Sequence, residues 1–256
     1  MKKKTIMLAI LLPLLQASAQ NPDAAQIMMK CRDLSITRSM TGKMNLKITE
    51  KNGSTRNRTI SMTSKSYDGG LEKRLIRFLE PADVRGTAML IVDNRDIPDE
   101  MWIYLPALKK TRRIVTSEKG KSFMSSEFSN ADMTSPTLSD FSYKHITVAG
   151  PANQWIIESI PVTDDKADEY GFSRRISYID KDSYQTKKME FYGFDNRLFK
   201  VIEIRDVVLL RDGKYMIRDM AASNLLNGRK SEIVFSNLSE GTDIDDSFFT
   251  LRNLEK

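Results

Sequence analysis

Few residues of this chain could carry out acid–base or nucleophilic chemistry. His145 is the only histidine and Cys31 the only cysteine among 256 residues. A Ser-His-acid triad would have to use His145, and no G-x-S-x-G elbow marks a nucleophilic serine. One histidine and one cysteine also fall short of the ligands that a tetrahedral zinc site requires. We therefore expect no catalytic residue, no metal site and no cofactor.

Acidic clusters are the next candidates for chemistry. They are Asp164-Asp165, Asp168-Glu169 and Asp243 with Asp245-Asp246. None has the spacing of a calcium loop, with its central glycine and distal glutamate. We predict solvated turns at these positions. A glycosidase would need two carboxylates facing each other across a cleft, which the sequence leaves open.

Basic residues are densest at Lys109-Lys110 and Arg112-Arg113, a short run with few stacking aromatic residues beside it. Nucleic-acid binding would need a longer positive surface with interleaved aromatics, so no nucleic-acid partner is expected. In a strand, Lys110 and Arg112 would share one face and Arg113 the other. Such charges could steer an anionic headgroup or keep a strand edge soluble.

The N-terminus has the three parts of a secretory signal peptide. Lys2 to Lys4 form a positive region, an apolar run covers residues 6–15, and Ala17-Ser18-Ala19 supplies small residues for cleavage. The run is about half of the ~20 residues that span a bilayer. We predict cleavage after Ala19 and export to the periplasm. Loss of three lysines would lower the net charge from +6 to +3.

The remaining residues, 20–256, are predicted to form a single domain. No Pro-, Gly- or Ser-rich linker divides them, and one cysteine allows no internal disulfide, so the fold must depend on core burial. A first helix is expected, with Asn21 as N-cap and Pro22 at its first position. Its apolar stripe would be Ala24, Ile27, Met28 and Cys31.

After this helix the hydrophobic period changes to two. Met44, Leu46 and Ile48 alternate with polar residues, as in a half-buried strand, and Asn52-Gly53 then forms a hairpin turn. The same pattern continues to the C-terminus and predicts about a dozen antiparallel strands, mainly β, in one large curved sheet. The predicted strands cover 44–49, 56–65, 73–80, 88–92, 101–105, 109–115, 144–149, 154–160, 174–179, 186–192, 198–210, 214–221 and 232–238.

One segment breaks this pattern. Ser117 to Ser139, here called the flap, lacks alternation and carries Phe123, Met124 and Phe128 among polar residues. Long apolar-spotted loops between strands are often functional. We predict a partly helical flap against the sheet, either covering a ligand site or filling the core of the domain with its aromatic side chains.

The stretch from Met101 to Met133 resembles a known family. Trp102-Ile103-Tyr104-Leu105-Pro106 leads into a basic strand, and Gly120, Ser122-Phe123-Met124 and Asp132-Met133 follow. This pattern resembles the outer-membrane lipoprotein-sorting protein family, which is related to the Lol-type periplasmic lipoprotein carriers.

The resemblance implies an open, strongly curved antiparallel sheet, an incomplete barrel with covering helices. It also implies that the concave cavity holds an acyl chain for transport to the outer membrane. In the Lol carriers a strand arginine bonds to the lid; Arg56 and Arg58 are candidates by position.

The expected function is therefore that of a monomeric periplasmic carrier of a lipid or lipoprotein acyl chain, with an inner-membrane exporter as a further partner. Five residues are predicted to bind the ligand: Trp102, Tyr104, Phe123, Met124 and Phe128. Two alternatives remain. One is a non-enzymatic adaptor or sensor that binds an exporter or a regulatory protein, and the other is an enzyme acting on a lipid or a sugar.

Overall fold

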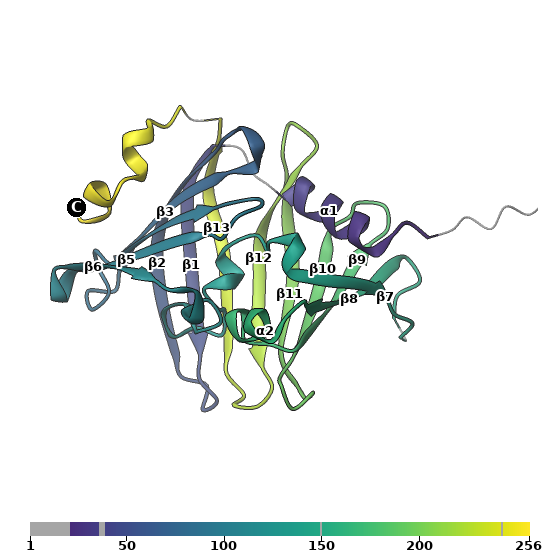
Figure 1. Cartoon of the computed structure of the whole chain (residues 1–256). Coiled ribbons are helices and arrows are strands. Elements are labelled where there is room, and N and C mark those ends of the chain that lie inside the picture. The colour runs from purple at the N-terminus through teal and green to yellow at the C-terminus, as the bar shows by residue number, and fades with distance from the viewer. Residues whose placement is uncertain (1–20, 36–38, 149, 242) are drawn as a thin grey trace, which may run out of the picture.

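A single antiparallel sheet of thirteen strands forms the body of the protein (Figure 1). The computed structural model describes residues 21–35, 39–148, 150–241 and 243–256. The strand order is β6-β5-β4-β3-β2-β1-β13-β12-β11-β10-β9-β8-β7, so β6 and β7 are the two edges and the sheet is not closed. The predicted fold class, mainly β with an open, strongly curved antiparallel sheet and covering helices, is confirmed, and the helices are few.

Each predicted strand has a counterpart in the structure. The strands are β1 Met40–Thr49, β2 Thr55–Ser66, β3 Glu72–Glu80, β4 Ala88–Asp93, β5 Glu100–Leu105, β6 Lys110–Ile114, β7 Phe141–His145, β8 Gln154–Pro161, β9 Arg174–Asp180, β10 Thr186–Tyr192, β11 Leu198–Leu209, β12 Tyr215–Asn224 and β13 Lys230–Glu240. The seventh strand lies three residues earlier than predicted and pairs Phe141 with Pro161 of β8. Consecutive strands pair with each other, with the exception of β6 and β7. In addition, the first strand, β1, pairs with the last, β13.

The described residues also form three α-helices beside the sheet: α1 Ala24–Ser35, α2 Asp164–Tyr170 and α3 Leu251–Leu254. The predicted stripe of α1 is buried, but Asp23, not Asn21, caps the helix by accepting from the Gln26 amide (3.4 Å).

The predicted solvated turns at Asp164-Asp165 and Asp168-Glu169 are wrong. These acids belong to α2, where the Thr163 side chain caps the helix and negative charge in the first turn is favourable.

Strand alternation divides the apolar residues between the two faces of the sheet. The larger cluster fills the concave face, with Leu46, Ile60, Phe78 and Met101 nearly inaccessible to solvent. A smaller cluster lies on the opposite face, where Leu90 packs against residues of the C-terminal segment, which runs along β3 to β5. Both faces of β3, β4 and β5 are therefore covered, which a simple alternating pattern does not reveal.

The predicted signal peptide, residues 1–19, lies outside the described residues. Within the described ranges, no helix has both the length and the hydrophobicity needed to cross a membrane.

Candidate functional site

The flap joins the two edges of the open sheet. It begins after β6 and ends before β7, which lie at opposite ends of the strand order, so the chain must cross the concave side between them (Figure 1). Four short 3-10 turns form this crossing: Thr116–Glu118, Phe123–Ser125, Ala131–Met133 and Leu138–Asp140. The partly helical flap predicted from the sequence is therefore present as a series of single turns.

The aromatic residues of the flap are inserted into the concave core. Phe123 and Phe128 are fully buried, and the Phe123 ring lies 6.3 Å from that of Phe78 on β3. Met124 is partly buried and packs against the same cluster. These three predicted ligand-binding residues thus lie on the concave side, where they fill the domain's own core. Their contact with a ligand stays a prediction.

Trp102 and Tyr104 lie elsewhere. We expected them to line or border the cavity, but both pack against the smaller cluster under the C-terminal segment. Their neighbours on β5, Met101 and Ile103, point to the concave core instead. The physical reason is that β5 is apolar on both faces, so alternation alone could not assign the inner one.

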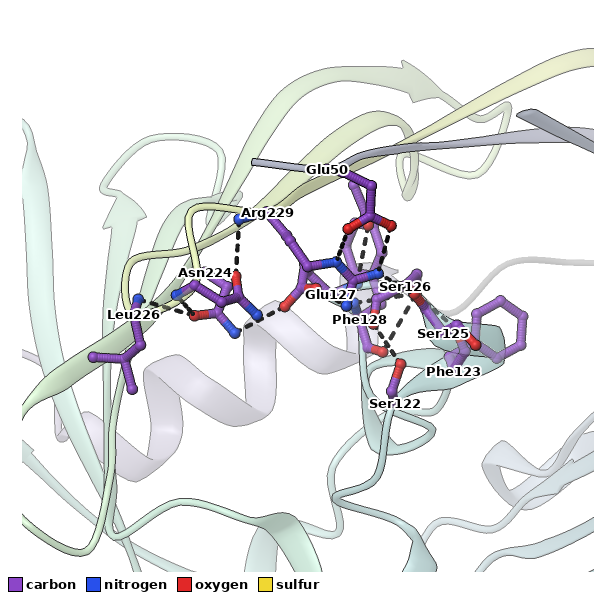
Figure 2. Close-up of polar contacts among 12 residues, drawn as sticks. Glu50, Ser122, Phe123, Ser125, Ser126, Glu127, Phe128, Asn224, Leu226 and Arg229 are labelled. Carbon is purple, nitrogen blue, oxygen red and sulfur yellow. Dashed lines mark hydrogen bonds and ion pairs between the residues drawn. The ribbon is translucent and has the colours of Figure 1, made fainter. Parts of the chain in front are cut away.

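A group of polar side chains holds the tip of the flap to the sheet (Figure 2). Arg229, just before β13, pairs with Glu127 of the flap (2.8 Å) and with Glu50 (2.9 Å), and it donates to the Ser125 carbonyl oxygen (2.8 Å). Asn224 donates to the second Glu127 oxygen (2.8 Å). We call Glu50, Glu127, Asn224 and Arg229 the clasp.

An arginine of β2 also contacts the flap. The buried Arg58 guanidinium donates to the carbonyl oxygen of Met124 and lies over the Phe78 ring, 5.9 Å from its centre. Burial lowers the pKa of Arg58. Arg56, the other candidate, instead forms an exposed ion pair with Glu50 (2.6 Å). Of the two arginines proposed by position, Arg58 is the one that bonds to the flap.

Further along, the flap is anchored by charged side chains from both halves of the sheet. Lys200 of β11 pairs with Asp132 (2.7 Å), and Arg74 of β3 donates to the Met133 carbonyl oxygen (2.7 Å). The Ser135 amide donates to Asp93 of β4 (2.8 Å). In the strand order, β3 and β4 lie on one side of the β1–β13 pair and β11 lies on the other. The flap therefore spans the concave face from one half of the sheet to the other.

The start of the flap is fixed by a buried trio of charges. Lys119 lies between Asp99 (3.3 Å) and Glu169 of α2 (2.9 Å), and all three side chains are at most 5% exposed. Burial raises the pKa of Asp99, although Lys119 opposes the rise. Glu169 has a lowered pKa despite its own burial, because it is bonded to Lys166 as well as Lys119.

A cavity of about 290 Å³ lies between the concave face, α1 and the second half of the flap. Its wall is mostly apolar and unusually rich in one flexible residue type, namely Met28, Met44, Met62, Met133, Met189, Met216 and Met220. Cys31 of α1 also lines it, and burial raises the pKa of this thiol to about 12, which suits a packing residue. Among the described residues, no group of three or more His, Cys, Asp or Glu side chains could hold a metal ion.

The buried carboxyl group of Asp93, which accepts a hydrogen bond from the flap, should make the stability of the protein depend on pH. Burial and the carboxylates of Asp99 and Glu72 raise the pKa of Asp93 from 3.8 to about 7, although the Ser135 amide and Arg74 oppose this. At a pH between these two pKa values, Asp93 holds a proton in the folded protein and has released it in the unfolded chain. The stabilisation is therefore complete below pH 4 and lost as the pH rises towards 7, at about 1.4 kcal/mol per pH unit.

We expect urea unfolding to show lower stability at pH 8 than at pH 5, and this difference to shrink in Asp93→Asn. The asparagine oxygen can still accept from the Ser135 amide, so the variant should fold. An unchanged difference between the two pH values in Asp93→Asn would assign the pH dependence to other groups.

The fold is similar to those of solved bacterial proteins. A Vibrio parahaemolyticus domain provisionally described as an outer membrane lipoprotein-sorting protein is 24% identical, with a TM-score of 0.82, over 91% of this chain and 98% of that one. A DUF1329 family protein from Desulfovibrio piger is 26% identical, with a TM-score of 0.80, over 90% and 97%. A LolA superfamily protein from Nitrosomonas europaea is 16% identical, with a TM-score of 0.70, over 91% and 99%.

The chain thus has the LolA-like, lipoprotein-sorting fold, and the resemblance found at Met101 to Met133 is confirmed at this level. A family model described as "Uncharacterized protein" matches residues 70–256, which is most of the chain, and the chain belongs to that family. Comparison with curated proteins finds no match.

Proposed function

We propose that this protein is a periplasmic carrier that holds a lipid or lipoprotein acyl chain in the concave cavity for transport to the outer membrane. The main support for this proposal is an apolar cavity that is lined on one side by the flap. Polar contacts with the sheet hold the flap in place. The lipoprotein-sorting fold and the predicted signal peptide support the same proposal. No catalytic step is part of it.

The chemistry of the wall suits an acyl chain. Each methylene transferred from water is worth about 0.8 kcal/mol, so affinity needs apolar surface and no specific polar partner. Methionine side chains repack easily around ligands of different shape, and seven of them face this cavity. A carrier of varied acyl chains would use both properties.

The flap offers a way to enlarge the cavity. At about 290 Å³ the cavity lies near the lower end of the range for ligand sites, ~300–1,000 Å³. Phe123 and Phe128 occupy the concave face, so their withdrawal with the flap would free further apolar surface. In this mechanism the two phenylalanines act as a removable plug, and the clasp and Arg58 hold it in place.

The proposal is tested by looking for bound lipid. The mature protein would be produced with its export signal in a membrane-bearing bacterium, purified without detergent, extracted with organic solvent and analysed by mass spectrometry. We expect lipid at a near-stoichiometric level. Repeated preparations that are free of lipid, and that also fail to bind added acyl compounds, would refute the carrier function.

A further inference from the structure

Arg175 of β9 is a buried cation in the cavity wall that lacks an acidic partner. The residue is 8% exposed and lines the cavity together with Phe191 of the neighbouring strand. Its Nε atom is buried without a hydrogen-bond partner, and within the described part of the chain its guanidinium makes no ion pair. Its guanidinium carbon lies 5.5 Å from the centre of the Phe141 ring.

The neighbouring charges do not neutralise Arg175. Asp132 is the carboxylate that acts on it most, but this group is already bound by Lys200 (2.7 Å) and by the Ser129 amide (2.7 Å). Arg74, another cation of the wall, has its own partner in Glu72. A buried charge without a partner is costly, so its presence in the wall calls for an anion that the described residues do not supply.

Further unpartnered polar atoms lie beside Arg175. Ser159 of β8 is its direct cross-strand partner and Ser177 is two residues along the same strand, so all three side chains share the inner face. Both serine hydroxyls are buried without a hydrogen-bond partner. Each could donate a hydrogen bond to an oxyanion held by the guanidinium.

A second arginine contributes to the same end of the cavity. Arg32 of α1 lines the cavity and donates to the carbonyl oxygens of Asn94 (3.2 Å) and Arg95 (3.0 Å), while its buried Nε lacks a partner. Burial raises the pKa of Tyr143 to about 12, and both Arg175 and Arg32 are close enough to oppose this rise. Two cations of the cavity wall therefore act on Tyr143.

We infer that this end of the cavity binds the oxyanion, carboxylate or phosphate, of an amphiphile whose acyl chain lies along the methionine-rich wall. The inference rests on the proposed carrier function and narrows its cargo to anionic lipids. A guanidinium suits this role because it can bind either oxyanion through two parallel hydrogen bonds. The buried serines would complete the shell around the anion.

The test compares ligands with one acyl chain and different head groups. Myristic acid, myristyl alcohol and monomyristoyl lysophosphatidic acid would each compete with a neutral fluorescent acyl probe at pH 8. The wild type should bind at least one of the two anions about tenfold or more tightly than the alcohol, as one charge-assisted contact provides. The anion preferred identifies carboxylate or phosphate as the natural group.

Arg175→Gln should abolish this preference while leaving alcohol binding unchanged. Arg174→Gln is the matched control, because Arg174 points to the other face, where it pairs with Glu158 (3.1 Å) and lies over the Tyr192 ring. The control should keep the preference. Since Arg175→Gln removes an unpaired buried charge, its unliganded stability should equal or exceed that of the wild type; Arg175→Lys retains the charge and should retain part of the preference.

Four results would overturn the inference in distinguishable ways. Binding of both anions by the wild type no tighter than binding of the alcohol would refute an anion site and leave the carrier function standing. A preference that survives in Arg175→Gln would refute the assignment to this residue. Failure of all three acyl compounds to bind would refute the carrier function itself. Acetate and inorganic phosphate are included as competitors, and displacement of the probe by them at equal concentration would refute the need for an acyl chain.

Discussion

Lys119→Met should destabilise the protein by about 3–5 kcal/mol at pH 7, the usual cost of breaking a buried ion pair. Lys119 is the cation between Asp99 and Glu169, and all three side chains are almost inaccessible to water. Glu169 would keep Lys166 (2.9 Å), but Asp99 would lose the cation that opposes the rise of its pKa. The free energy of unfolding, measured in urea, reports this loss.

The same variant should show a characteristic pH dependence. With its pKa raised further, Asp99 would hold a proton in the folded state at pH values where the unfolded chain has released it. The penalty of Lys119→Met should therefore be smaller at pH 5 than at pH 7, and full once the pH exceeds the new pKa.

Lys121→Met is the control for this experiment. Lys121 lies two residues further along, is 67% exposed, and pairs with Glu118 at 3.8 Å. Exposed pairs of this kind contribute about 0–1 kcal/mol, so this variant should resemble the wild type. A Lys119→Met protein that is also within 1 kcal/mol of the wild type would mean that the buried trio does not hold the start of the flap.

Arg229→Met should release the tip of the flap. The change removes the ion pairs to Glu127 and Glu50 and the bond to the Ser125 carbonyl, and it leaves Glu127, whose side chain is 7% exposed, with Asn224 alone. We expect a loss of stability of about 2–3 kcal/mol, between the values for exposed and buried pairs. We also expect faster uptake of a fluorescent acyl probe and faster protease cleavage within the flap.

Arg56→Met is the matched control for the clasp. Arg56 binds the same Glu50 (2.6 Å) with a half-exposed side chain, but among the described residues it forms no hydrogen bond or ion pair with the flap. It should change stability by less than about 1 kcal/mol and leave probe uptake and cleavage unchanged. If Arg229→Met takes up the probe at the wild-type rate, either the clasp does not control access or the ligand enters by another route.

Much of this architecture could be predicted from local patterns. Alternation along residues 44–49 correctly predicts that Met44, Leu46 and Ile48 share a buried face. Helical spacing correctly predicts the buried stripe of α1. The predicted Asn52-Gly53 turn was equally informative, because Gly53 adopts the positive φ that its hairpin requires. These features depend on neighbours in the chain, so the sequence alone contains the information.

The tertiary structure decides which face of each strand points to the concave core. Trp102 and Met101 are both apolar neighbours on β5, and only the packing of the C-terminal segment over Trp102 decides that Met101 faces the concave core. Arg174 and Arg175 are likewise adjacent and chemically alike, yet one stacks on an outer tyrosine and the other lines the cavity. Alternation puts such neighbours on opposite faces without stating which face is inner.

The scarcity of catalytic groups could be predicted directly from residue counts, because His145 is the only histidine and Cys31 the only cysteine of the chain. The arrangement of the cavity could not, because its wall combines α1, the flap and strands that are up to about 190 residues apart in sequence, such as Met44 and Phe235. The pairing of β1 with β13 brings those strands together and leaves β6 and β7 as the edges that the flap must connect. Short-range pattern specifies each strand, whereas long-range pairing and burial decide which side chains enclose the cavity.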